Sequence, residues 1–189
     1  MKKIFLLMLL ICAVVMNGCD FGKKEPAPVN PPKQEIKQQS FIVYRAAADG
    51  REKLLPEKFT INDNGKTVAE NALIALVSTK PQDASMEDVI PIGTKVLGLK
   101  IDEKGTAYAN FSKELCKKGQ GSYGEMMLCY AIANTLTEFP EIKRVQILIE
   151  GNKVTTISGH MDVEEPLIRN KDFLWYEEYG LQLFLMKLC

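Results

Sequence analysis

The clearest local signal in the sequence is a β-hairpin near its middle. Apolar and polar residues alternate over residues 94–101 and again over residues 106–111, as in strands with one buried face. Residues 102–105 separate the two runs and end in Gly105, which suits a tight turn that needs positive φ. Any fold that accommodates this segment must therefore contain antiparallel β-structure.

Helical patterns lie on both sides of this hairpin. Apolar residues recur at helical spacing from about residue 67 to residue 78, and Pro81 follows this run. A second, mostly apolar helical band extends from about residue 123 to residue 137 and ends near Pro140. The sequence thus predicts two helices.

Three further runs predict strands. Residues 41–44 and 54–61 form the first two, and Pro56 indicates that the second is an edge strand or contains a bulge. Residues 145–149 predict a buried strand, and after a glycine-containing turn we expect residues 154–157 to pair back. Helices interleaved with hairpins predict an α+β fold, with a small mixed or antiparallel sheet and two helices packed on one face.

The first 18 residues have the parts of a secretory signal peptide. Lys2 and Lys3 precede an apolar run of 13 residues. A membrane-spanning helix needs about 20 such residues, and no stop-transfer pattern follows. We therefore expect residues 1–18 to be a removable leader and the protein to be exported.

Cleavage after Gly18 would leave Cys19 as the first residue. A Gly-Cys pair at this place resembles a bacterial lipobox, whose cysteine receives a diacylglyceryl group, although Met16 and Asn17 differ from the pattern's preferred residues. This resemblance implies lipidation at Cys19 and a lipid anchor on the outer face of the bacterial cytoplasmic membrane. The alternative is an ordinary signal peptide cut nearby, which leaves Cys19 as a free thiol.

The rest of the chain divides into three parts. Residues 19–39 hold four of the nine prolines and almost nothing apolar, so we expect an extended tether. Residues 40–170 form the folded α+β domain. Residues 171–189 form an apolar C-terminal extension, for which two interpretations remain open: a helix or strand that covers the sheet, or an exposed patch for a partner.

Charge and cysteine content exclude several classes of function. Without the leader, 22 basic residues face 24 acidic ones, so nothing indicates a nucleic-acid partner or a polybasic lipid-binding patch. No Cys-x-x-Cys pair is present to suggest zinc or thioredoxin chemistry. We expect Cys129 to be a small buried hydrophobe. Spacing leaves a Cys116–Cys129 disulfide open.

A series of short segments spans the folded region in a fixed order. They are Leu55-Pro56-Glu57, residues 69–76, residues 91–97, residues 109–112, Gly121-Ser122 with Glu125, residues 134–139, residues 145–151, and Gly159-His160 with Asp162. Together these segments, over about residues 41–170, resemble the GerMN domain of spore-germination and sporulation lipoproteins. The resemblance implies a non-enzymatic cell-envelope domain whose fold is similar to the ring-building domains of secretion machines. One such domain is visible here, where the best-known member of the family looks like a tandem of two.

Two motifs suggest chemistry and are interpreted structurally. Residues 119–124 match G-x-G-x-x-G, but residues 112–118 separate them from the preceding strand, which belongs to a hairpin. We therefore expect no nucleotide, and a loop in which Ser122 is the helix N-cap. His160, the only histidine, lies near Asp162 and other acids; one imidazole makes a poor zinc site, so we expect its ring to bond nearby backbone in a turn.

Polar residues late in the second helix also have structural interpretations. We expect Asn134, Thr135 and Thr137 to satisfy the backbone of a neighbouring loop, and Thr137 to bond back to helix carbonyls. No residue is predicted to be catalytic, to bind a cofactor or to ligate a metal.

The leading hypothesis is a non-enzymatic, lipid-anchored module that assembles with other cell-envelope proteins, in sporulation or spore germination. The predicted partners are the membrane, through the lipid on Cys19, and envelope proteins, with no nucleic acid and no nucleotide. The alternative is a domain of the vegetative envelope that binds cell wall or a small ligand, with weak hydrolysis centred on His160.

Overall fold

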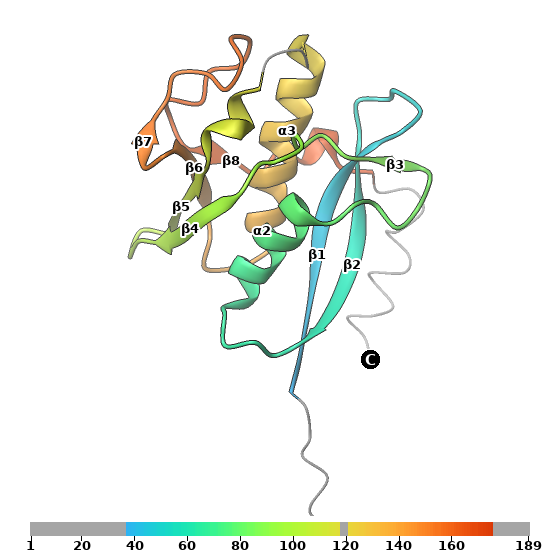
Figure 1. Ribbon diagram of the computed structural model, residues 1–189, viewed down its shortest axis with the longest axis vertical. Coiled ribbons are helices and arrows are strands. Elements are labelled where there is room, and N and C mark those ends of the chain that lie inside the picture. The colour runs from blue at the N-terminus through green and yellow to red at the C-terminus, as the bar shows by residue number, and fades with distance from the viewer. Residues whose placement is uncertain (1–36, 118–120, 176–189) are drawn as a thin grey trace, which may run out of the picture. The chain divides into compact units, whose positions relative to one another are not determined.

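The computed structural model describes residues 37–117 and 121–175 (Figure 1). The predicted leader, the predicted lipidation site Cys19 and nearly all of the predicted tether therefore lie outside the described residues, as do residues 176–189. No helix among the described residues is both long enough and apolar enough to cross a membrane.

The first sheet is built on a long hairpin. β1 (Gln38–Ala47) pairs antiparallel with β2 (Leu54–Asn62), and β3 (Met86–Glu87) pairs with the end of β1, so β2 is an edge strand. Pro56 lies in β2, as the edge-strand prediction required, because an edge leaves room for a residue without an N–H. β1 begins at Gln38, inside the predicted tether, because Gln38 pairs with Asn62.

The second sheet contains the predicted central hairpin. β4 (Val96–Ile101) and β5 (Thr106–Phe111) are antiparallel, and β5 then pairs in parallel with β6 (Arg144–Ile149). A parallel pair needs a crossover, which the second helix supplies between β5 and β6. The short strands β7 (Asn152–Lys153) and β8 (Leu167–Ile168) both pair with β6. The expected return strand at residues 154–157 is wrong: β7 ends before it.

The two predicted helices are confirmed. α2 spans Val68–Ser78, and its N-terminus is closed by Thr67, whose side chain accepts the Glu70 N–H while the Glu70 carboxylate accepts the Thr67 N–H. α3 spans Gly121–Leu136. Short 3₁₀ turns, η1 (Lys113–Cys116) and η2 (Lys171–Phe173), follow β5 and β8.

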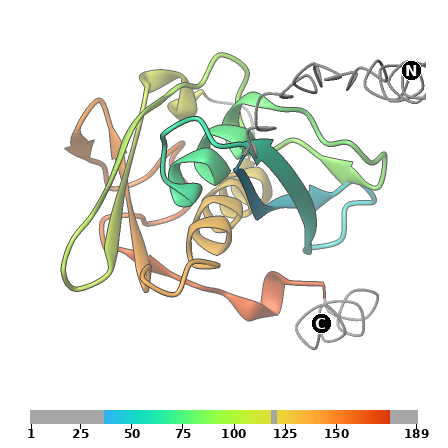
Figure 2. The ribbon, with the colours of Figure 1, turned by 90° about the horizontal axis from the view of Figure 1, so that it is seen from below.

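The helices lie between the two sheets. Both contact β1, while α2 also packs on β4 and α3 on β6 and β8. In both views the helices separate the β4–β5 hairpin from the β1–β2 hairpin (Figures 1 and 2). The predicted α+β class is confirmed, with its strands divided between two small sheets.

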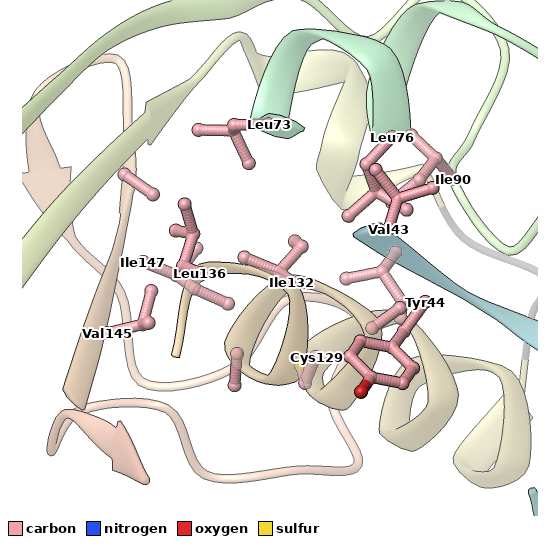
Figure 3. Close-up of a cluster of buried hydrophobic side chains, with 14 of the residues drawn as sticks. Val43, Tyr44, Leu73, Leu76, Ile90, Cys129, Ile132, Leu136, Val145 and Ile147 are labelled. Atoms are coloured by element: carbon pink, nitrogen blue, oxygen red, sulfur yellow. The ribbon is translucent and has the colours of Figure 1, made fainter. Parts of the chain in front are cut away.

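One core joins these layers. Val43 from β1, Leu76 from α2, Ile132 from α3 and Ile147 from β6 are almost completely buried and converge there (Figure 3). Burying each such side chain stabilises the fold by about 1.5–3 kcal/mol. Cys129 is fully buried, as predicted.

The disulfide that spacing left open does not form. Cys116 and Cys129 are both free thiols. No disulfide between these two cysteines therefore links η1 to α3.

Candidate functional site

α3 carries three fully buried polar side chains, and each of them fixes a different segment of the chain. Glu125, Asn134 and Thr135 are 0% exposed. A buried polar group costs free energy unless it is hydrogen-bonded, so the partners of these residues show whether they serve structure or chemistry.

The Glu125 carboxylate holds the loop that contains the sole histidine. Its Oε1 accepts the N–H groups of Ile157 and Ser158, both at 2.9 Å. Its Oε2 accepts the Ser158 hydroxyl and the His160 N–H, both at 2.8 Å. Burial opposes ionisation of Glu125, but the donors from Ser158, His160 and Ile157 outweigh it and lower the pKa of the carboxyl.

His160 is placed in a turn, as predicted, but by a different atom. Its backbone N–H is bound to Glu125, while its side chain is exposed, so a ring bond does not fix the turn. Gly159 precedes it at φ 105°, a conformation that favours glycine. Among residues 37–117 and 121–175, no group of three or more His, Cys, Asp or Glu side chains could hold a metal ion.

Asn134 binds the backbone of a neighbouring loop, as predicted. It donates from Nδ2 to the Asn170 carbonyl at 3.0 Å and accepts the Asn170 N–H at 2.9 Å. Thr135 accepts the Tyr44 N–H at 2.9 Å and so ties α3 to the edge of β1. The Thr137 hydroxyl donates to the Ala133 carbonyl at 2.7 Å, which confirms the predicted back-bond.

A charged cluster lies beyond the C-terminal end of α3. The Tyr44 hydroxyl donates to Glu138 at 2.6 Å, and Arg169 donates to both of these side chains. Burial and the Glu138 carboxylate raise the pKa of Tyr44 well above its ordinary value, so the phenol stays protonated and is no acid–base group near neutral pH. A shallow hollow of about 410 Å³ lies beside Arg169 and is lined in part by Tyr130 and Lys171.

A second charged cluster is buried between β1, β2 and α2. Arg45 Nε lies 2.8 Å from Glu57 Oε2, and its Nη2 donates to Thr79 at 2.7 Å. The second Glu57 oxygen accepts the Gln82 N–H at 2.6 Å. Because partners inside the fold bind both charges, this pair holds the sheet against α2 and offers nothing to a ligand.

The glycine-rich motif is only partly included among the described residues. β5 leads into η1 before α3 begins, which confirms that the motif does not follow directly from a strand. α3 begins at Gly121, so Ser122 lies in the first helical turn and the predicted N-cap role is wrong. Gly119 and Gln120 lie outside the described residues.

Exposed apolar side chains mark a surface that the sequence did not reveal. Among the strands that the structure describes, β4 pairs only with β5 and forms one edge of its sheet. Leu97 and Ile101 on this edge strand are 47% and 40% exposed, and Ile92 just before it is 89% exposed. The alternation of residues 94–101 predicted the strand, but an edge is decided by which strands pair elsewhere, and local sequence does not carry that information.

The solved structures most useful for comparison contain GerMN domains. The tandem GerMN domains of the sporulation protein GerM from Bacillus subtilis superpose with a TM-score of 0.61 at 22% identity, covering 72% of this chain and 48% of that one. The first of these domains alone superposes with a TM-score of 0.59 at 23% identity, covering 69% of this chain and 98% of that one. This chain thus spans about half of the tandem structure.

A lipoprotein structure shares the fold as well. A putative lipoprotein from Clostridium perfringens gives a TM-score of 0.50 at 22% identity, covering 75% of this chain and 95% of that one. A search of curated proteins found no match.

The family profile is the stronger result. The Germane profile, described as sporulation and spore germination, matches residues 42–155. This range contains both helices, the β4–β5 hairpin and all but the first four residues of the β1–β2 hairpin. The chain therefore belongs to the Germane family, and its folded region is a GerMN domain.

Proposed function

We propose that this protein is a non-enzymatic, lipid-anchored domain that mediates protein assembly in the cell envelope, in sporulation or spore germination. In this proposal the lipid on Cys19 holds the chain at the outer face of the cytoplasmic membrane. Family membership supports the link to sporulation and germination. The edge of β4 is the surface through which the domain binds other envelope proteins.

The observation that carries the proposal is the apolar edge of β4. An edge strand exposes unpaired backbone N–H and C=O groups, and an extended segment of a partner can add to them as a further strand. Main-chain hydrogen bonds then supply affinity, while exposed side chains such as Leu97 and Ile101 supply contact area and specificity. Ile92, which is also exposed, lies four residues before the strand begins.

The polar clusters support a binding role over a catalytic one. Glu125 is occupied by four donors from its own chain, and the Arg45 guanidinium is occupied by Glu57 and Thr79. Tyr44 is held protonated by burial and by Glu138. A catalytic group needs a reactive atom within reach of substrate, and these atoms are turned inward.

Site-specific photocrosslinking tests the proposal in cells that express the full, anchored chain. A photoreactive residue at Leu97 is expected to capture an envelope protein during sporulation. The matched control is Ile168, which is also apolar and exposed (67%) but lies on β8 beside the hollow. Leu97→Glu should abolish a capture made from Ile101, while Ile168→Glu should leave it unchanged. Equal capture from Leu97 and Ile168, or none from either, contradicts the proposal.

The anchor has its own test. Metabolic labelling with a fatty acid should mark the protein, and Cys19→Ala should remove the label. Label that survives the substitution would exclude Cys19 as the lipidated residue.

The same variants distinguish the proposed function from the alternative, binding of cell wall or a small ligand. A domain that binds cell wall or a small ligand would use the hollow beside Arg169, so Ile168→Glu would impair it and Leu97→Glu would not. Hydrolysis centred on His160 would be lost in His160→Ala. We expect neither effect.

A further inference from the structure

The regular part of the β4 edge is short. The register of β4 against β5 shifts between Val96 and Gly98, so Leu97 is the extra residue of a β-bulge. The strand ends at Ile101, where the hairpin turn begins. An added strand can therefore pair in a regular way over residues 98–101, a length of about 13 Å.

Two residues of this stretch direct their backbone groups outward. The Asp102 N–H donates to the Thr106 carbonyl at 3.0 Å, so the backbone of Asp102 faces β5. Backbone groups alternate between the two sides of a strand. Lys100 therefore faces β5 as well, while Leu99 and Ile101 direct their N–H and C=O groups away from β5, toward a strand that would be added.

The side chains divide between the two faces of the sheet. Leu99 and Ile101 pair with alanines of β5 that are fully buried, so both lie on the apolar face of the sheet, and α2 packs on β4. Lys100 pairs with Tyr108 on the opposite face and is exposed. The edge thus presents apolar side chains on one face and a lysine on the other.

Gly98 leaves room beside this lysine. It pairs with Asn110 and so lies on the same face as Lys100. A Cβ added at Gly98 would meet no atom within 4 Å. A glycine inside a strand often marks a place where another chain approaches closely, and here the space beside it is open to a partner's side chain.

The charge of Lys100 is not compensated within the described residues. Each ion pair among residues 37–117 and 121–175 is formed by an arginine. The Asp102 carboxylate accepts two N–H groups of its own turn, while Glu103 is exposed in that turn. Lys95 and Lys104, on either side of the strand, are exposed too. The surface along β4 is therefore predominantly basic.

A second copy of the same edge fits this surface poorly. Lysine on an edge strand opposes pairing with a like strand. Two β4 strands paired antiparallel about Lys100 would place both lysines on one face, opposite each other, and like charges in that position destabilise a sheet. A carboxylate in the same position reverses the sign of the interaction.

We propose that the β4 edge binds an extended segment of a partner protein in which apolar residues alternate with acidic ones. This inference rests on the proposed function and names the chemistry of the partner at the same surface. The backbone of the segment pairs with Leu99 and Ile101, and its apolar side chains extend the apolar face beside them. Its carboxylate lies beside Lys100 on the opposite face.

Hydrogen exchange of the full mature chain tests this inference with two synthetic peptides as probes. Valine alternates with glutamate in the first peptide, and lysine replaces glutamate in the second. The glutamate peptide should slow exchange of the Leu99 and Ile101 amides at least about 10-fold, while the Lys100 amide, which faces β5, stays unchanged. Absence of protection by the glutamate peptide, or equal protection by the lysine peptide, overturns the proposal.

A charge reversal tests the role of the lysine. In Lys100→Glu the lysine peptide should protect the Leu99 and Ile101 amides, and the glutamate peptide should no longer do so. The matched control is Lys58→Glu, which changes an exposed lysine on the edge strand β2 and should leave the preference for the glutamate peptide intact. A preference that Lys100→Glu does not alter overturns the proposal.

Photocrosslinking in cells separates this inference from the proposed function. Lys100→Glu should abolish the capture made from Leu97 during sporulation, and Lys100→Arg should retain it. Capture that survives Lys100→Glu overturns the acidic partner while the proposed function stands. Absence of capture in the wild type overturns both.

Discussion

Glu125→Gln is a sharp test of how the loop around His160 is held. The substitution keeps the size of the side chain and one acceptor oxygen. It replaces the other oxygen with an amide NH₂, which cannot accept the Ser158 hydroxyl or the His160 N–H now bound to Oε2. The two donors that face Oε1, from Ile157 and Ser158, keep a neutral acceptor in place of a charged one.

The expected loss of stability follows from the number of hydrogen bonds that the substitution removes or weakens. A hydrogen bond to a charged group contributes about 1.5–3 kcal/mol net, and a neutral one about 0.5–1.5 kcal/mol. Ser158 and His160 lie near solvent, so water replaces part of what the two lost bonds supplied. We expect the free energy of unfolding to fall by about 2–4 kcal/mol, which for a chain of this length lowers the Tm by roughly 5–15 °C.

The effect should depend on pH in a defined direction. The pKa of Glu125 is lowered in the folded state because its hydrogen-bond donors outweigh the cost of burial. A carboxyl with a depressed folded pKa stabilises the fold above its unfolded pKa, about 4.3, and loses this contribution as the pH falls through the folded value. The difference in free energy of unfolding between the wild type and Glu125→Gln should therefore be largest at neutral pH and should decrease in acid.

Urea unfolding followed by circular dichroism at several pH values measures the loss of stability and its pH dependence. The matched control is Glu165→Gln, an exposed carboxylate a few residues after His160, which should change stability by less than about 0.5 kcal/mol. A Glu125→Gln variant as stable as this control would refute the role assigned to the carboxylate. So would a stability difference of constant size from neutral to acid pH.

Three further results are expected. Arg45→Ala should lower the free energy of unfolding by about 3–5 kcal/mol in urea unfolding, because it leaves a buried carboxylate uncompensated. Gly105→Ala should destabilise more than Gly50→Ala in thermal unfolding: both glycines have φ 78°, but only at Gly105 would the new Cβ lie 2.8 Å from a backbone carbonyl oxygen. Thiol alkylation followed by mass spectrometry should modify Cys116 well before Cys129, since burial raises the pKa of the Cys129 thiol to about 12.

The features that sequence predicted well are those decided by neighbours in the chain. The turn that ends in Gly105 and the apolar spacing of α2 and α3 are local, so the hairpin and both helices lie where the pattern placed them. The parallel pairing of β5 with β6 is not local. It depends on α3 packing between the sheets. The return strand expected at residues 154–157 was wrong: Thr156 forms an isolated bridge with Asp162, and the Ile157 N–H is bound by Glu125.

The buried polar residues show the same limit. Asn134 was expected to bind a loop, because an amide in an apolar band must find a partner, but the sequence could not name Asn170 as that partner. Glu125 is a carboxylate in an equally apolar band, and the family resemblance grouped it with Gly121-Ser122, apart from Gly159-His160. One signal could have joined Glu125 to the loop at Gly159-His160. A buried carboxylate needs hydrogen-bond donors, and the N–H groups of the loop need an acceptor.

The buried polar side chains of α3 fix the loop at residues 157–160, the loop at Asn170 and the edge of β1, so a single helix orders three separate segments of the chain. Groups used in this way are unavailable for chemistry with a substrate. In the proposed function, the outer edge of β4 is the surface left for recognition of a partner.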